Sequence, residues 1–88
     1  MVKLKQAYLD ITKGRANSYS LREIVINPSV VSMISPCTFG DSIHLPEGLD
    51  PRVEFSTVYT SNGRALVVVG APSVLEEKFR SSKILLKG

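Results

Sequence analysis

The segment from Val53 to Lys78 constrains the fold of this chain more than any other, because it predicts three consecutive elements of secondary structure. Its first part, Val53 to Thr60, is expected to be a strand whose successive side chains point to opposite faces. The run from Ala65 to Val69 is apolar throughout, which is typical of a strand at the centre of a sheet. The Asn62-Gly63 pair between them predicts a tight type I′ hairpin, since both residues tolerate positive φ.

A helix is expected after the break at Gly70-Ala71-Pro72. The residues from Ser73 to Glu76 fit a capping box. In this motif the Ser hydroxyl accepts the backbone N–H of the third helical residue, and the Glu side chain accepts the backbone N–H of the cap residue. Val74, Leu75 and Phe79 would then pack on the sheet, and Ser81-Ser82 would end the helix. Residues 81–88 are therefore predicted to form a short tail.

Three further strands are expected upstream, at Val2–Ile11, Tyr19–Asn27 and Val30–Ser35. A polar segment at 12–18 separates the first two strands, and Asn27-Pro28 ends the second because proline has no amide donor. A single helical turn at Pro28–Val31 is an alternative at this point.

These elements predict a mainly β (α+β) fold for residues 1–88, folded as a single domain. We expect a small, bent antiparallel sheet of about five strands with one helix near the C-terminus. A chain of 88 residues builds only a small hydrophobic core, and self-association is a common way to stabilise such a core.

The long loop at 36–52 is the first candidate for a functional surface. It contains three of the five prolines, and it is longer than an ordinary connection in a compact domain. It is also too apolar for a plain linker, and an exposed apolar loop is typical of an interface. With the apolar centre of the tail, it predicts a protein interface that comprises Phe39, Ile43, Leu45, Leu49, Ile84 and Leu85.

The charged residues indicate an alternative function. Eleven Lys and Arg against eight acids give a net charge of +3, which is mild for a dedicated nucleic-acid-binding protein. Basic residues nevertheless gather near the predicted turns. They could contact phosphates, and the candidates are Lys13, Arg15, Arg22 and Arg64.

The sequence lacks the patterns of catalysis and metal binding. His44 is the only histidine, and its spacing from Asp41 and Glu47 matches no metal-ligand pattern. Cys37 is the only cysteine, so no intrachain disulfide can form. No nucleophile elbow or phosphate-binding loop is present. We therefore expect no enzymatic activity and no cofactor.

Neither a signal peptide nor a membrane span is expected. The first ten residues lack an apolar core of signal-peptide length. The longest apolar run, Ala65 to Val69, is much shorter than a transmembrane helix. A cytoplasmic protein without membrane contacts is therefore expected.

Several short motifs resemble the flagellar-operon proteins of the FlbD and SwrD type. They are Lys3-Leu4 on the first strand, Ile26-Asn27-Pro28, Asn62-Gly63 and Glu76-Glu77. That family pattern lacks the segment from Cys37 to Arg52. The resemblance therefore implies the fold and not a flagellar role.

A closer resemblance is to small proteins of contractile-tailed phages that infect cyanobacteria. It rests on Ser20-Leu21-Arg22-Glu23-Ile24, on Leu45-Pro46-Glu47-Gly48-Leu49-Asp50 and on the residues from Val67 to Val74. This likeness implies a viral protein that acts in the host cytoplasm, and it makes the loop phrase part of the family pattern.

The expected function is that of a non-enzymatic protein-binding or self-assembling module, a viral accessory or regulatory protein. Its partner would be another protein or a second copy of the chain in a homo-oligomer. The alternative is a small nucleic-acid-binding regulator that uses the basic residues near 13–22 and 64.

Overall fold

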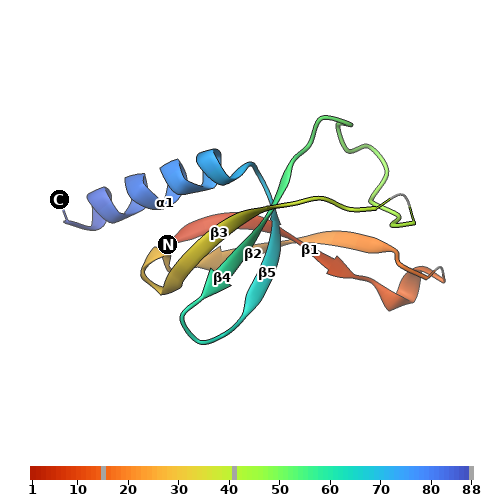
Figure 1. Ribbon diagram of the computed structural model, residues 1–88, viewed down its shortest axis with the longest axis horizontal. Helices are drawn as coiled ribbons and strands as arrows, with labels where there is room; N and C mark the ends of the chain where they lie inside the picture. The colour runs from red at the N-terminus through yellow and green to blue at the C-terminus, as the bar shows by residue number, and fades with distance from the viewer. Residues whose placement is uncertain (15, 41, 88) are drawn as a thin grey trace.

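The fold is a five-stranded sheet with one long helix (Figure 1). The computed structural model describes residues 1–14, 16–40 and 42–87, with side chains up to residue 82. The strands are β1 (Val2–Leu9), β2 (Tyr19–Ile26), β3 (Val31–Cys37), β4 (Phe55–Thr60) and β5 (Ala65–Val69), and the helix is α1 (Pro72–Lys87). Two short 3₁₀ helices, η1 (Ile11–Lys13) and η2 (Pro28–Val30), follow β1 and β2.

The strands form a single antiparallel sheet in the order β2-β1-β5-β4-β3. The predicted mainly β fold with one C-terminal helix is thereby confirmed. β5 lies between β1 and β4, as its unbroken apolar sequence predicts. β2 and β3 form the two edges.

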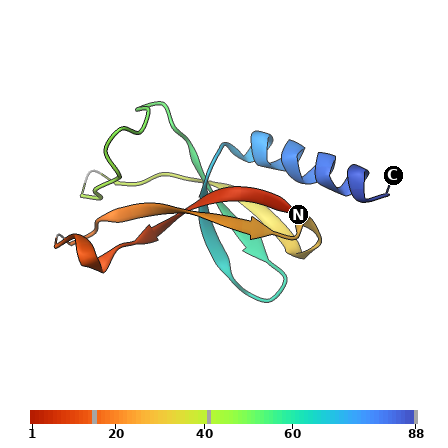
Figure 2. The ribbon, with the colours of Figure 1, turned by 180° about the vertical axis from the view of Figure 1, so that it is seen from behind.

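The sheet must bend strongly, because consecutive strands form its opposite edges. In a flat sheet, five strands at a spacing of about 4.8 Å would place the edges about 19 Å apart. The chain from Ile26 to Val31 spans at most about 17 Å when fully extended, and η2 shortens that reach. The strands accordingly cross and twist instead of lying flat (Figures 1 and 2).

The main core lies on the face of the sheet that α1 covers, which we call the helix face. Leu75 and Phe79 of α1 pack there against Val58 and Val68, and the cluster also includes Val2, Leu4 and Ile26. Val74 was predicted to pack there too, but it is 50% exposed, because it lies on the side of α1 that faces away from the sheet. Val58, Val68 and Leu75 are fully buried. Burial of each such side chain contributes roughly 1.5–3 kcal/mol to stability.

Gly70 lets the chain turn from β5 into α1. Its φ is 130°, in the region that favours glycine, and a Cβ at this position would lie 3.1 Å from Cδ2 of Leu75. The Ser56 hydroxyl, which is buried, donates to the Gly70 carbonyl at 2.6 Å. The tight turn thus fixes the helix against the sheet.

The β4–β5 turn differs from the predicted type I′ hairpin. The Gly63 N–H donates to the Thr60 carbonyl at 3.0 Å, and the Thr60 N–H donates to the Arg64 carbonyl at 2.9 Å. Gly63 has a φ of 86°, whereas Asn62 is not among the residues with positive φ. These bonds make a three-residue hairpin loop with glycine in the left-handed position, so only one residue needs positive φ.

Both predicted ends of the helix are wrong. α1 begins at Pro72, and the Leu75 N–H donates to the Ala71 carbonyl at 3.0 Å, so Ser73 is not the cap. Proline is favoured at the first helical position because the N–H it lacks has no partner there. α1 then continues through Ser81-Ser82 to Lys87, since serine is only mildly unfavourable inside a helix. Residues 81–87 are therefore helical and do not form a separate tail.

The region between β2 and β3 contains the single helical turn that was the predicted alternative, in 3₁₀ form. The Asn27 side chain caps η2 by accepting from the Ser29 N–H at 3.0 Å. β3 then includes Pro36 and Cys37, which were predicted to belong to the loop. Proline is tolerated there because β3 is an edge strand.

Candidate functional site

The connection between β3 and β4, residues 38–54, forms the candidate site; we call it the long loop. Its middle pairs with the start of β2 through a one-residue parallel bridge between Ser18 and His44. The Tyr19 N–H donates to the His44 carbonyl at 2.8 Å, and the His44 N–H donates to the Asn17 carbonyl at 2.9 Å. The long loop is thus hydrogen-bonded to the strand at the opposite edge of the sheet.

Three aromatic rings connect the long loop to the sheet. The ring centroids of Tyr19 and Phe39 lie 5.3 Å apart, and those of Phe39 and Phe55 lie 5.0 Å apart at an interplanar angle of 84°. Such pairs contribute about 0.5–1.5 kcal/mol each beyond their burial. Phe55 points away from the helix face, because it and Val58 occupy odd and even positions of β4. The rings therefore form a second, smaller core on the other face.

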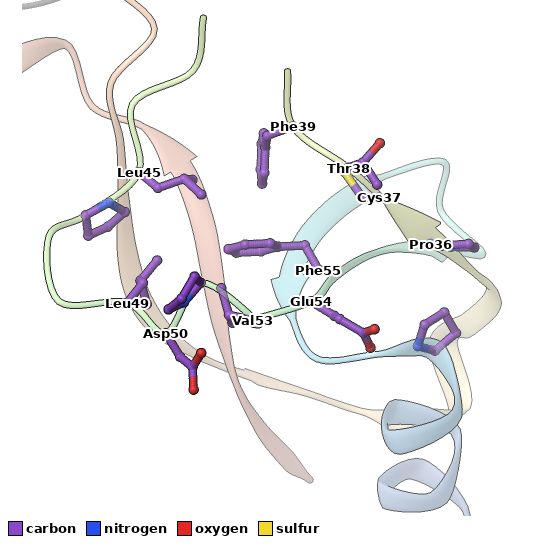
Figure 3. A pocket seen from close by; sticks show the side chains of 13 residues that line it. Pro36, Cys37, Thr38, Phe39, Leu45, Leu49, Asp50, Val53, Glu54 and Phe55 are labelled. Carbon is purple, nitrogen blue, oxygen red and sulfur yellow. The ribbon is translucent and has the colours of Figure 1, made fainter. Parts of the chain in front are cut away.

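A pocket of about 480 Å³ lies between the long loop and the ends of β3 and β4 (Figure 3). Phe39 and Phe55 form an aromatic wall, and Leu45 and Leu49 lie across from them. The remaining lining residues are Pro36, Cys37, Thr38, Pro46, Asp50, Pro51, Val53, Glu54 and Pro72. A mostly apolar cavity of this size is typical of a binding site.

Asp50 and Glu54 also line this pocket, and Figure 3 shows their carboxylates at its edge, on the side opposite Phe39. Asp50 also orders the chain that follows it: its Oδ1 accepts from the Arg52 N–H at 2.8 Å, and its carbonyl accepts from the Val53 N–H at 2.9 Å. Aspartate before proline is the favoured start of a type I turn. The pocket therefore combines apolar walls with negative charge.

The structure brings together half of the predicted protein interface. Phe39, Leu45 and Leu49 all line the pocket, whereas half-buried Ile43 does not. Ile84 and Leu85 lie in α1, and their side chains are outside the described residues. The most important pocket residue that the prediction missed is Phe55. It was missed because its position depends on the register of β4 against β3 and β5.

The predicted nucleic-acid contacts do not lie together. Lys13 is at the end of the β1–β2 hairpin, and Arg64 follows the β4–β5 turn, which projects from another part of the molecule (Figure 1). Arg22 is engaged within the hairpin, where its Nε donates to Gln6 at 2.9 Å and its guanidinium lies 4.9 Å from the centre of the Tyr8 ring. Arg15 is outside the described residues. Nucleic-acid binding stays an untested prediction.

A second cavity, of about 440 Å³, adjoins the pocket. Leu45 and Pro46 line both spaces, and Lys13, Tyr19, His44 and Glu47 also line the second. The second cavity therefore lies between the end of the β1–β2 hairpin and the long loop.

Asp10 organises that hairpin end. Its Oδ1 accepts from the backbone N–H and the hydroxyl of Thr12, and its Oδ2 accepts from the Ser20 hydroxyl at 2.7 Å. The Asp10 N–H donates to the Ser18 carbonyl at 2.8 Å. The hydrogen bonds from Thr12 and Ser20 lower the pKa of Asp10 below its ordinary value of 3.8.

Replacing Asp10 by alanine should lower the melting temperature at neutral pH and have less effect in acid. Because the pKa is lower in the folded state, the carboxylate stabilises the fold above pH 3.8, and this contribution is lost as the pH falls through the folded value. Thermal melts of both proteins between pH 7 and pH 2 measure the difference. A difference in melting temperature that stayed constant over this range would contradict the assignment.

Two further features of the described residues bear on function. None of the helices between residues 1 and 87 has the length and apolarity that a membrane span requires. Residues 1–14, 16–40 and 42–87 contain no group of three His, Cys, Asp or Glu residues placed to hold a metal ion.

Comparison of the chain with protein-family models, curated proteins and solved structures gives no match. The resemblances to cyanophage proteins and to the FlbD and SwrD type therefore stay predictions.

Proposed function

We propose that this chain is a non-enzymatic protein-binding module and that the pocket under the long loop receives a side chain of the partner. The single observation that carries this proposal is the apolar cavity of about 480 Å³ with an aromatic wall. Interfaces derive most of their affinity from a few apolar or aromatic anchors buried in such pockets.

The way the long loop is held supports this function. The bridge at His44 and the contacts of Phe39 with Tyr19 and Phe55 fix the loop on two sides. A partner therefore meets a preformed cavity, and little conformational entropy is lost in ordering the loop.

The charges of the pocket indicate what the partner offers. Asp50 and Glu54 favour a cation beside the entering group, and the walls favour an aliphatic or aromatic side chain. We expect a partner segment that presents an apolar residue one or two positions from Lys or Arg.

A Leu49→Asp variant should lose at least about tenfold in affinity for such segments, because it places a charge in the apolar wall. The measurement uses random peptides displayed on phage and selected against the full chain, followed by titration of synthetic copies of the enriched sequences. Enriched peptides should contain an apolar residue one or two positions from a basic one.

Val74→Asp is the matched control, because Val74 is exposed on α1 and does not line the pocket. It introduces the same chemical change and should leave the affinity unaltered. Absence of any enriched peptide, or equal binding to the wild type and the Leu49→Asp variant, would refute the proposal.

A further inference from the structure

The end of the β1–β2 hairpin, residues 9–13, exposes apolar side chains that the fold does not use; we call it the tip. Ile11 is 86% exposed, and Leu9 is 51% exposed. Ile11 is the most exposed large hydrophobic residue among those that the structure describes. Single exposed apolar residues are common on protein surfaces, but Ile11 stands out by the way the tip is built and by where the tip lies.

The tip is ordered by a capped 3₁₀ turn and its hydrogen bonds. Ile11 begins η1, which the Asp10 side chain caps and which ends at Gly14 in the left-handed conformation, with a φ of 74°. Asp10 also holds η1 against β2 through the hydroxyl of Ser20. Ile11 is therefore presented on a preorganised turn, which reduces the entropy lost when it is buried against a partner.

The tip and the long loop lie at the same end of the molecule, opposite the C-terminal end of α1 (Figures 1 and 2), and the long loop lines the pocket. Lys13 of the tip lines the second cavity together with Leu45 and Pro46, which also line the pocket. Because Ile11 is exposed, it does not fill the pocket of its own chain.

We propose that the occupant of the pocket is the tip of a second copy of this chain. Ile11 of one copy enters the apolar cavity of the other, and Lys13 brings its ammonium group to the carboxylates of Asp50 and Glu54. This inference rests on the proposed function, since it names the partner of the same pocket.

Reciprocal exchange gives a closed dimer with two-fold symmetry. Each copy carries both the tip and the pocket on one continuous surface, so a two-fold axis between them makes both contacts at once. The tip has the chemistry that the pocket favours, an apolar residue two positions before a lysine.

Sedimentation equilibrium of the full chain over a range of concentrations tests the dimer. The wild type should be a dimer, Ile11→Asp should raise the dissociation constant by about 30-fold or more, and Val74→Asp should leave it unchanged. Ile11→Asp should keep the fold, because the side chain is almost fully exposed.

Mixing the Ile11→Asp and Leu49→Asp variants gives a sharper result. One variant retains the pocket and the other retains the tip, so the mixture should form a heterodimer through one intact contact, weaker than the wild-type dimer. A variant that had merely lost its fold could not restore association. If Leu49→Asp fails to fold, Leu45→Ser replaces it in the mixture.

A monomeric wild type at all concentrations, or a dimer that Ile11→Asp leaves intact, would overturn the inference. If peptides still bound the pocket in that case, the proposed function would stand, and the partner would be a different protein instead of a second copy of this chain. If the wild type neither bound peptides nor formed a dimer, both proposals would be overturned.

Discussion

Replacing Leu75 by alanine should lower the free energy of unfolding by about 2–5 kcal/mol, the usual cost of truncating a fully buried leucine. Leu75 has no exposed surface, belongs to the main core and fills the space that a Cβ at Gly70 would need, at the turn that leads into α1. The effect is large because small domains have a net stability of only about 5–15 kcal/mol.

Urea denaturation followed by circular dichroism measures this change. Val74→Ala is the control from the adjacent helical position, where the side chain is 50% exposed, and it should change stability by no more than about 0.5 kcal/mol. Equal shifts of the urea midpoint in the two variants would show that α1 does not pack as described.

Replacing Phe55 by alanine should cost about 3–5 kcal/mol and should also release the long loop. Phe55 is 6% exposed, and its ring packs edge-on against Phe39, which in turn contacts Tyr19. Removing it takes away both a buried ring and a wall of the pocket.

Phe79→Ala separates these two effects. Phe79 is also 6% exposed, but it belongs to the core on the helix face. Both variants should lose similar global stability. Only Phe55→Ala should lose the hydrogen-exchange protection of the Tyr19 and His44 amides under conditions where the sheet stays folded. Equal protection of these amides in the two variants would contradict the role of Phe55.

The order of the main elements could be predicted because their signals are local. The unbroken apolar run from Ala65 to Val69 requires cover on both faces, and β5 is indeed central. The prediction erred where two local signals competed. Pro72 precedes Ser73, and proline at the first helical position displaced the expected capping box.

The candidate site could be predicted only in part, because its two sides come from distant segments. The apolar character of Leu45 and Leu49 identified one wall in the sequence. The other wall includes Phe55, and its position facing Phe39 requires the bend of the sheet and the pairing of Cys37 with Phe55. No single local pattern encodes that geometry.

The tip could have been recognised from one local signal. Asp10 precedes Thr12 by two residues, the spacing at which an aspartate side chain accepts the backbone N–H of a turn. The first strand was instead predicted to continue to Ile11, because β-branched and apolar residues favour strands. The capping bond ends β1 at Leu9 and leaves Ile11 on the exposed turn.

The bridge at His44 has a consequence for aggregation. β2 and β3 are edge strands, and an open edge is a template on which further chains can add as strands. The His44 carbonyl of the long loop accepts the Tyr19 N–H of β2, so this donor is not open to another strand. On β3, Pro36 has no amide hydrogen that could pair with another strand. Each edge strand therefore lacks a free backbone N–H at one position, which opposes the addition of further strands and the growth of fibrils.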